Sequence, residues 1–232
     1  MSISLNSKKK RTPSSRKWLL RQLNDPYVLK SKKEGYRSRA AFKLIDIDNK
    51  FKILKTRQVV IDLGCAPGGW LQVVKQRVKG GIIIGVDLQE FESISGIRSI
   101  IGDFTEKETI NNIIEVLQGK KADVVLSDMA SSACGISSVD HTRIMFLVKC
   151  VLNFCDMVLE KDGCMVAKVL RGGTENTLLA EMKKKFKKVS HFKPPSSRSD
   201  SAEIYVVAIG YNPTIKNCES KLPGNFQEIG NN

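Results

Sequence analysis

The sequence lacks the features that define several protein classes. It has no uninterrupted apolar run near the roughly 18 residues that a membrane helix needs, so a soluble protein without a membrane partner is expected. Its six cysteines contain no C-x-x-C pair, which predicts neither a zinc site nor a disulfide framework. The two histidines, His141 and His191, have no partners at metal-ligand spacing. No metal is expected, and both histidines are interpreted as packing or surface residues.

Positive charge is concentrated near the N-terminus. The 232 residues include 38 Lys and Arg against 24 Asp and Glu, a net charge of +14, and residues 1–40 hold 12 of the basic residues but only two acids. This asymmetry is typical of a polyanion-binding arm, and nucleic acid is the polyanion it favours. A solubilising tail and an organellar presequence stay open as alternatives.

The segment VVIDLGCAPGGW, residues 59–70, organises the rest of the chain. Its apolar start predicts a buried strand, Gly64, Gly68 and Gly69 predict a tight turn, and a helix is expected from Trp70. Strand, turn and helix in this order form the ligand-binding corner of a doubly wound α/β fold. Ala66 stands where a dinucleotide fingerprint has its second glycine, which disfavours nicotinamide or flavin binding.

Four acids follow four predicted strands: Asp62, Asp87, Asp103 and Asp128. Carboxylates there would repel a polyphosphate but suit a cationic ligand that offers ribose hydroxyls and an adenine amine. S-adenosylmethionine has all of these features, including a sulfonium. Helix capping or loop solvation remains the alternative explanation for each acid alone.

Strand-like and helix-like segments alternate, which predicts one α/β domain with a mostly parallel sheet and helices on both faces. The predicted strands are Val59–Leu63, Ile82–Val86, Ile97–Ile101, Asp123–Ser127 and Cys164–Val169. The predicted helices between and after them are Trp70–Val78, Ile110–Leu117, Thr142–Leu159 and Leu178–Phe186. Two last strands, Lys188–Lys193 and Glu203–Ile209, are expected to pair as an antiparallel hairpin.

The flanking segments complete the expected organisation. Residues 1–15 are interpreted as a flexible basic arm, residues 16–211 as the domain and residues 212–232 as a loose tail. Within residues 16–51 we predict a helix over Arg16–Tyr27 that Pro26 closes, and a second that Ser38 caps and that ends near Phe51. The lysine-rich stretch 183–188 is interpreted as the solvated face of a helix.

Five motifs together identify a resemblance to a known family. GYRSRAAFKL, VIDLGCAPGGW, LSDMA, VAKVLRGG and SSRSDSAEIYVVA, in this order and at these spacings, resemble the RrmJ/FtsJ family of heat-shock ribosomal RNA large-subunit 2′-O-methyltransferases from about Ser15 to Tyr211. The resemblance implies a Rossmann-like methyltransferase domain over residues 16–211, with seven strands of which the last is inserted antiparallel. S-adenosyl-L-methionine is the implied methyl donor.

The resemblance also implies a catalytic tetrad of Lys43, Asp128, Lys168 and Glu203. Lys168 is expected to be the general base, Asp128 to position Lys168 and the cofactor, Lys43 to tune the electrostatics and clamp the substrate, and Glu203 to orient it. With the strand-end acids, the expected cofactor-binding residues are Asp62, Gly64, Gly68, Gly69, Trp70, Asp87, Asp103 and Asp128. By analogy with the family, Asp87 would meet the ribose and Asp103 the adenine.

Ribose methylation explains why a lysine is useful. A 2′-hydroxyl is a poor nucleophile, so a base that removes its proton helps the in-line attack. Only a neutral amine can accept that proton, whereas a free lysine, with a pKa of about 10.4, is almost wholly protonated at pH 7. Because Lys168 lies in an apolar run, burial there demands a partner acid.

Two positions depart from the family pattern. Ser131 and Ser132 replace the Pro-Asn that often follows the LSDMA motif, which puts the contacts of that loop in doubt. Cys65 replaces the usual alanine of the glycine turn, and an exposed thiol there would make the site oxidisable.

The resemblance implies a substrate: the 2′-hydroxyl of one uridine in the A loop of 23S ribosomal RNA, within the large ribosomal subunit. Arg37, Arg39 and Arg198 would then bind RNA phosphates. A monomer in the bacterial cytoplasm is expected, with the mitochondrial matrix as the alternative location. Transfer RNA or another RNA as substrate, and a non-catalytic RNA-binding assembly factor, remain the alternative functions.

Overall fold

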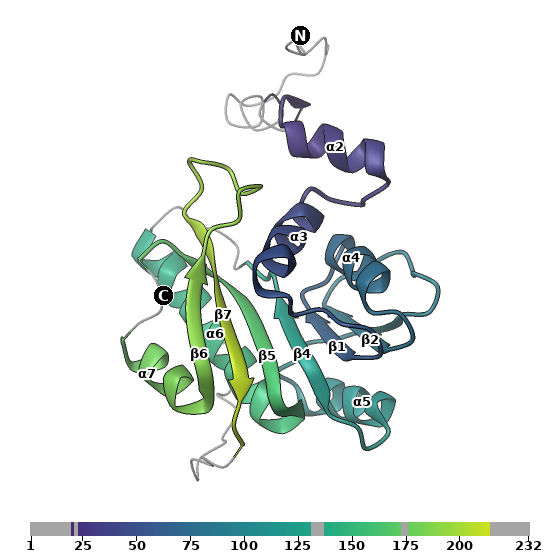
Figure 1. The fold of residues 1–232 in the computed structure, drawn as a ribbon, viewed down its shortest axis with the longest axis vertical. Helices are drawn as coiled ribbons and strands as arrows, with labels where there is room; N and C mark the ends of the chain where they lie inside the picture. Colours follow the sequence, from purple (N-terminus) through teal and green to yellow (C-terminus); the bar gives the residue numbers. More distant parts are fainter. Residues whose placement is uncertain (1–19, 21–22, 131–136, 173–175, 214–232) are drawn as a thin grey trace, which may run out of the picture.

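The structure, a computed structural model, describes residues 20, 23–130, 137–172 and 176–213. The expected arm at residues 1–15, Ser131, Ser132 and residues 214–232 of the expected tail lie outside these ranges. Seven strands form one sheet in the order β3-β2-β1-β4-β5-β7-β6 (Figure 1). They are β1 (Val59–Leu63), β2 (Ile82–Asp87), β3 (Arg98–Ile101), β4 (Ala122–Ser127), β5 (Leu159–Leu170), β6 (Phe186–Phe192) and β7 (Glu203–Tyr211).

The sheet is parallel except where its last strand enters. β1 pairs with β2 and β4 in parallel, β2 with β3, and β4 with β5. β7 is antiparallel to both of its neighbours, β5 and β6. The predicted α/β class and the antiparallel hairpin of the last two strands are therefore confirmed, with the final strand inserted between β5 and β6.

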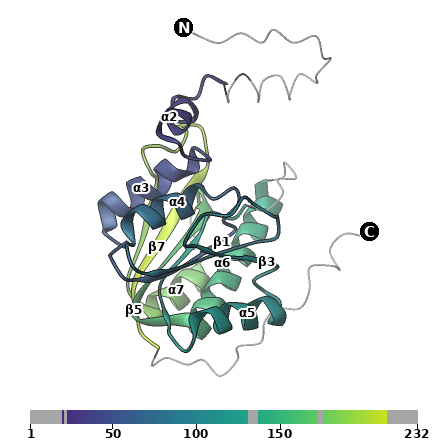
Figure 2. The ribbon, with the colours of Figure 1, turned by 90° about the vertical axis from the view of Figure 1, so that its right-hand side faces the viewer.

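Helices cover both faces of the sheet. They are α2 (Pro26–Glu34), α3 (Ala40–Phe51), α4 (Gly69–Arg77), α5 (Lys107–Leu117), α6 (Ser137–Val158) and α7 (Asn176–Lys185). Figures 1 and 2 show α3 and α4 on one face and α5, α6 and α7 on the other. Residues of β1 alternate between the two layers, because successive side chains of a strand point to opposite faces. Ile61 and Leu63 accordingly pack with α5 and α6, whereas Val60 packs with α3 and α4.

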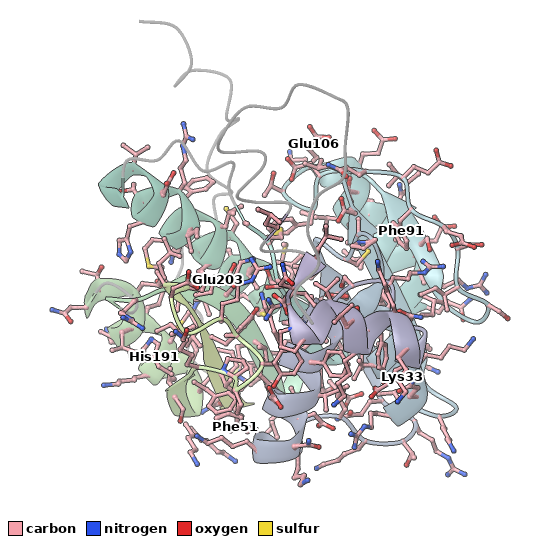
Figure 3. All side chains as sticks on the ribbon, turned by 90° about the horizontal axis from the view of Figure 1, so that it is seen from above. Lys33, Phe51, Phe91, Glu106, His191 and Glu203 are labelled. Atoms are coloured by element: carbon pink, nitrogen blue, oxygen red, sulfur yellow. The ribbon has the colours of Figure 1, made fainter. Side chains whose placement is uncertain are left out.

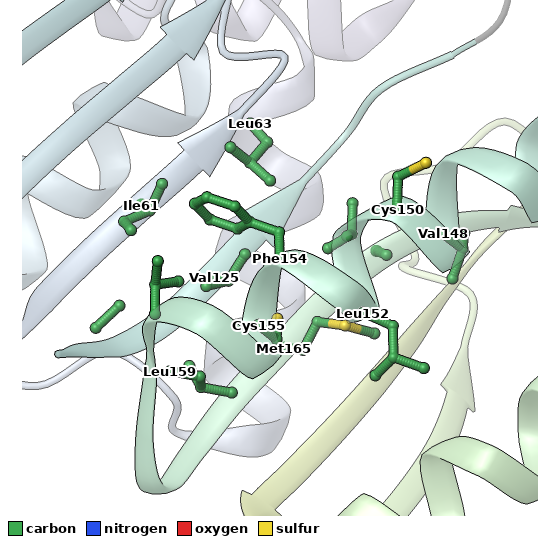
Figure 4. Close-up of a cluster of buried hydrophobic side chains, with 14 of the residues drawn as sticks. Ile61, Leu63, Val125, Val148, Cys150, Leu152, Phe154, Cys155, Leu159 and Met165 are labelled. Carbon is green, nitrogen blue, oxygen red and sulfur yellow. The ribbon is translucent and has the colours of Figure 1, made fainter. Parts of the chain in front are cut away.

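The larger apolar core lies under α6. Phe154 of this helix is 1% exposed and packs against Ile61 and Leu63 of β1 (Figure 4). Cys150 and Cys155, on the same helix, are buried and free. This core holds the parallel strands rigidly, so the carboxyl ends of β1, β2 and β4 form a fixed edge for a site.

Pro26 begins a helix, whereas the sequence predicts that it ends one. α2 starts at Pro26, and Asp25 is its N-cap, with a side chain that accepts a hydrogen bond from Tyr27 N at 3.0 Å. Proline suits the first helical position because the N–H it lacks has no partner inside the helix. The sequence analysis did not predict α2. The helix expected over Arg16–Tyr27 lies partly outside the described residues, and Leu20 and Leu23, which the structure describes, are helical.

Ser38 does not cap the second helix. α3 begins at Ala40 with Arg39 as its N-cap, and no side chain makes the capping hydrogen bond. The Ser38 hydroxyl is buried without a hydrogen-bond partner among the described residues. Its Oγ lies 2.3 Å from the place where a Cβ on Gly69 would stand, so Ser38 packs against the glycine turn.

The lysine-rich stretch is only partly a solvated helix face. α7 ends at Lys185, which is 5% exposed, while Lys187 and Lys188 lie in β6. Phe186, predicted as the end of the helix, is the first residue of that strand. Asp156 of α6 and Glu181, one turn earlier on α7, pair with Lys185 and allow its burial. The Asp156 contact joins two helices, and local periodicity cannot reveal it.

Candidate active site

The four residues of the predicted tetrad come from four elements and meet at one end of the sheet. Lys43 lies in the second turn of α3, Asp128 directly follows β4, Lys168 is in β5, and Glu203 begins β7. The antiparallel register places Lys168 opposite Tyr205 and Leu170 opposite Glu203. Figure 3 looks down on this end of the molecule and shows Glu203 well inside the outline.

Asp128 is the centre of the cluster. The Lys168 Nζ lies 3.1 Å from Asp128 Oδ1 and donates to the backbone carbonyl of the same residue at 2.7 Å. The Lys43 Nζ is 3.8 Å from Asp128 Oδ1 and 3.0 Å from Glu203 Oε2. Both lysines are buried, at 8% exposure for Lys43 and 6% for Lys168. The expected partner acid of Lys168 is therefore present, and it is Asp128.

Tyr205 belongs to this cluster, although the sequence analysis missed it. Its hydroxyl donates to Asp128 Oδ1 at 2.6 Å, and the side chain is completely buried. The Lys43 Nζ lies 5.8 Å from the centre of its ring. The signal in the sequence is weak, since only the strand register reveals that Tyr205 stands opposite Lys168.

The lysines keep the two acids of the cluster ionised. Burial opposes ionisation of Asp128, but Lys168 and Lys43, together with the hydrogen bond from Tyr205, outweigh burial and lower its pKa. Burial likewise opposes ionisation of Glu203, and Lys43 and Lys168 lower its pKa. Burial and the charge of Asp128 raise the pKa of Tyr205 well above its ordinary value, which keeps its hydroxyl a donor.

The glycine turn lies beside the cluster and depends on its glycines. A Cβ on Gly64 would stand 2.2 Å from Met129 Cγ, and a Cβ on Gly68 would stand 2.9 Å from an Arg37 nitrogen. Both residues have positive φ, at 73° and 103°, which favours glycine further. The turn therefore brings its backbone close to the chain segments that follow β4 and precede α3.

Two of the strand-end acids hold loops. Asp87 accepts hydrogen bonds from Ala66 N and Gln89 N, each at 2.8 Å, and so ties β2 to the glycine turn. Asp103 accepts hydrogen bonds from the backbone N–H and the hydroxyl of Thr105 at 2.8 and 2.7 Å. Both acids thus bind loop backbone, which was the alternative explanation for each of them. A carboxylate that accepts two hydrogen bonds can still accept more from a ligand.

Asp62 is different, because neither of its oxygens has a hydrogen-bond partner among the described residues. It lies in β1 next to the turn and is 1% exposed. Burial, with the nearby charges of Asp128 and Asp87, raises its pKa well above the ordinary range. A buried carboxyl without donors costs free energy, so a polar ligand that satisfied Asp62 would be favoured here.

Trp70 and Cys65 are packing residues in this structure. The Trp70 indole is 3% exposed and donates to Ala40 O at 2.8 Å, which joins α4 to α3. The Cys65 thiol is 4% exposed. Burial and the charges of Asp62 and Asp87 raise the pKa of Cys65, so it has little of the thiolate that oxidation needs.

The three arginines expected to bind RNA phosphates contact protein groups in this structure. The Arg37 guanidinium donates to Pro67 O at 3.1 Å and Ser93 O at 3.2 Å, and it forms an ion pair with Glu92 at 3.3 Å. Arg37 thereby ties the glycine turn to the chain that follows β2.

Arg39 and Arg198 both pair with Asp25. Arg39 pairs with Asp25 Oδ2, and the Arg198 Nε lies 2.9 Å from the same oxygen. In the protein without RNA, both arginines therefore bind Asp25. Their role in binding RNA phosphates is a proposal.

Residues 36–211 match the FtsJ-like methyltransferase family, and this range includes the glycine turn and the whole lysine–carboxylate cluster. The chain belongs to the FtsJ-like methyltransferase family. The expected resemblance is thus confirmed, and the protein is a methyltransferase. The cluster of Lys43, Asp128, Lys168 and Glu203, beside the glycine turn, lies within the range that matches the family.

Several relatives of this FtsJ-like methyltransferase are similar along most of its length. Ribosomal RNA large subunit methyltransferase E of Rickettsia bellii is 50% identical over 213 residues, which cover 89% of this chain and 93% of that protein. The protein of the same name from Azorhizobium caulinodans is 43% identical, with 95% of this chain and 93% of that protein covered. A crystal structure of a ribosomal RNA methyltransferase from Plasmodium falciparum has a TM-score of 0.70 and 33% identity, covering 76% of this chain and 98% of that chain.

Residues 20, 23–130, 137–172 and 176–213 contain no group of three His, Cys, Asp or Glu side chains that could hold a metal ion. Within the same ranges, no helix is long and apolar enough to span a membrane.

Proposed function

We propose that this methyltransferase transfers a methyl group from S-adenosylmethionine to the 2′-hydroxyl of a uridine in the A loop of 23S ribosomal RNA. The names of its relatives support ribosomal RNA of the large subunit as the substrate. The observation that carries the proposal is the cluster in which two buried lysines flank Asp128, beside Glu203. Such a set serves proton removal from a hydroxyl, which ribose methylation requires.

The residues around the glycine turn fit S-adenosylmethionine. Asp62 is buried without a hydrogen-bond donor, and a cationic ligand that carries amine donors satisfies it. When bound, the cofactor supplies a methyl group activated by a sulfonium. The residues proposed to hold it are Asp62, Gly64, Gly68, Gly69, Trp70, Asp87, Asp103 and Asp128.

Lys168 is the proposed general base. Its Nζ is held by the carboxylate and the carbonyl of Asp128, so the amine has a fixed position at the end of β4. In its neutral form the amine accepts the hydroxyl proton as the oxygen attacks, and the resulting ammonium is stabilised by the ionised Asp128. Holding the oxygen in line with the methyl carbon and sulfur supplies much of the acceleration.

Lys43 and Glu203 are proposed to act beside the base. Lys43 is proposed to tune the electrostatics of the cluster and to clamp the substrate, because its Nζ lies 3.8 Å from the same Asp128 oxygen that Lys168 contacts. Glu203 holds Lys43 at 3.0 Å and accepts hydrogen bonds, so it can orient the ribose. Its side chain is the most exposed of the four, at 34%, which makes its contribution the smallest.

The whole proposal places the enzyme on the large ribosomal subunit. Residues 16–211 form the methyltransferase domain, with the basic arm and Arg37, Arg39 and Arg198 as RNA-binding residues. A monomer suffices, because all four proposed catalytic residues lie in one chain. The relatives from Rickettsia bellii and Azorhizobium caulinodans are bacterial, which favours the bacterial cytoplasm.

A labelled methyl-transfer assay tests this function. Unmethylated large subunits, free large-subunit ribosomal RNA and transfer RNA are incubated with labelled S-adenosylmethionine. We expect label on one uridine ribose of the subunit, and a loss of about 10²- to 10⁴-fold in Lys168→Met. Lys187→Met is the matched control. Lys187 lies in β6, away from the cluster, and it is more than half exposed and pairs with Asp162. Label on transfer RNA alone, or on no RNA although the protein binds the cofactor, contradicts the proposal.

A further inference from the structure

Asp25 lies between two arginines at the start of α2. Its Oδ1 accepts the capping hydrogen bond from Tyr27 N at 3.0 Å, while Oδ2 pairs with Arg39 and with Arg198 Nε, the latter at 2.9 Å. The Asp25 side chain is 5% exposed. The three residues come from the starts of α2 and α3 and from the connection between β6 and β7. One carboxylate thus faces two guanidinium groups, and the group carries one net positive charge.

Asp25 leaves donors of this group unsatisfied. The Arg39 Nε is buried without a hydrogen-bond partner among the described residues, and so are the hydroxyls of Ser196 and Ser197. Ser196 is 1% exposed and Ser197 8%, and the Ser196 carbonyl accepts a hydrogen bond from Arg39. Buried donors of this kind normally have partners. The group therefore holds three buried donors, the Arg39 Nε and two hydroxyls, that Asp25 does not satisfy.

The charge balance supports the same conclusion. Burial, and next the positive charge of Arg198, lower the pKa of Arg39. An additional anion would relieve both the repulsion between the arginines and the unsatisfied N–H group. A phosphodiester has two charged oxygens, so it accepts from guanidinium groups and hydroxyls together, and arginine forks match its geometry.

The position of this group relates it to the substrate. Arg39 precedes Lys43 by about one turn of α3, and Arg198 precedes Glu203 in the same connection to β7. Against the larger effects of burial and Arg198, the carboxylate of Glu203 acts on Arg39 to raise its pKa. The group therefore borders the lysine–carboxylate cluster, where an RNA substrate must place the phosphates next to its target ribose.

We propose that Asp25 occupies, in the protein without RNA, the place of an RNA phosphate between Arg39 and Arg198, and that substrate RNA displaces it. This inference rests on the proposed RNA substrate. The displaced Asp25 keeps its capping bond through Oδ1. Ring contacts of Tyr27 and Tyr36 with Phe42, at 5.4 and 5.5 Å between centroids, keep α2 attached to α3. RNA thus gains two arginines while α2 stays folded.

The variant Asp25→Asn tests whether Asp25 competes with an RNA phosphate for Arg39 and Arg198 or only holds these arginines in position. Asparagine keeps an N-cap oxygen but removes the charge that competes with phosphate. We expect about three- to tenfold tighter binding of an A-loop fragment of large-subunit RNA at low salt, with the gain shrinking as salt rises. Glu34→Gln is the matched control, since it removes one negative charge from α2 at an exposed ion pair with Lys30. Fluorescence anisotropy measures both affinities, and thermal unfolding checks the fold.

Each outcome supports or overturns the proposed displacement of Asp25 by an RNA phosphate. Tighter binding by Asp25→Asn but not by Glu34→Gln, lost again in Asp25→Asn/Arg198→Ala, supports it. Binding equal to or weaker than that of Glu34→Gln overturns it, because Asp25 then only positions the arginines. Asp25→Ser, which also keeps an N-cap oxygen, repeats the comparison if Asn destabilises α2. If the wild type binds neither the A-loop fragment nor transfer RNA at low salt, the RNA substrate itself fails, and the exchange with it.

Discussion

Two buried lysine clusters of the same composition lie at opposite ends of β7. The site cluster (Lys43, Asp128, Lys168, Glu203 and Tyr205) includes the first residue of this strand, and the support cluster (Lys149, Asp156, Glu181, Lys185 and Tyr211) includes the last. Each has two lysines, two acids and a tyrosine whose hydroxyl donates to an aspartate. The central lysine is buried in both, with side chains 6% exposed.

Their surroundings differ although their composition does not. The site cluster lies at the carboxyl end of β4, beside the glycine turn and the unpartnered Asp62. In the support cluster, Lys185 joins α7 to α6 through Asp156 at 2.5 Å and contacts Glu181 at 3.0 Å. A buried lysine with acids and a tyrosine is therefore no mark of catalysis by itself. What distinguishes the site is its place at the strand ends, where ligands bind in this class of fold.

The central lysines provide the largest contrast. Lys168→Met is expected to lower kcat by about 10²- to 10⁴-fold, because the proposed general base is lost. Lys185→Met removes a lysine that is buried to the same extent and is expected to leave kcat close to the wild-type value. Single-turnover methyl transfer to large ribosomal subunits measures both. A comparable loss in the two variants would remove the distinction between the clusters.

The support cluster contributes to stability instead. Lys185→Met leaves Asp156 and Glu181 without the ammonium that they share. We expect the free energy of unfolding at pH 7 to fall by about 1–3 kcal/mol. This loss is smaller than for a wholly buried ion pair, because both acids are partly exposed. Burial opposes ionisation of Glu181, but Lys149 and Lys185 lower its pKa. Its stabilisation is therefore present above its unfolded pKa and lost as pH falls through the folded one. Urea unfolding at pH 7 and pH 3 checks this, and an equal loss at both values would rule out the ionic cause.

The two tyrosines give a smaller contrast. Tyr205→Phe removes a hydrogen bond that lowers the pKa of Asp128, so this pKa rises and the acid limb of the pH–rate profile moves to higher pH. We expect kcat to fall about tenfold, the equivalent of one hydrogen bond to a charged group. Tyr211→Phe loses about 1 kcal/mol of stability and leaves the pH profile unchanged. A shifted profile in Tyr211→Phe, or none in Tyr205→Phe, would contradict the assigned roles.

The smallest expected effect concerns Asp62. Its pKa is raised in the folded protein, so between the unfolded and folded pKa values the native state keeps a proton that the unfolded chain releases, and stability falls as pH rises. Asp62→Asn removes this dependence. Relative to the wild type, the variant is expected to gain thermal stability at pH 7 over pH 3. Melting curves at the two pH values measure the gain, and a difference independent of pH would show that Asp62 has a donor in the native state.

Local signals predicted most of the sheet, and they failed where a partner lies far away in the sequence. The run Val59–Leu63 is a strand with the predicted bounds, because four of its five buried residues are apolar and a glycine turn follows it directly. The cap at Ser38 was wrong, because Ser38 packs against Gly69, which lies far away in the chain. The helix that begins at Pro26 was not predicted, because proline was interpreted only as the end of a helix.

The candidate site was predicted to a similar extent. The motifs named Lys43, Asp128, Lys168 and Glu203, and the apolar run around Lys168 required a partner acid. The structure brings the four together and makes Asp128 that partner. Tyr205 was missed because its role follows from the register between β5 and β7, which no local pattern contains.

The amino-acid sequence by itself determined the fold class, the glycine turn and the residue types of the site, since periodicity and turn chemistry act between near neighbours. Only the tertiary structure decided how the charges pair. It joined Lys168 to Asp128, Lys185 to Asp156, and Arg39 and Arg198 to Asp25. It also left Asp62 without a hydrogen-bond partner in the part of the chain that the structure describes. The reason is physical: pairing depends on distance and burial, and both are set by elements that meet only when the sheet and its helices have assembled.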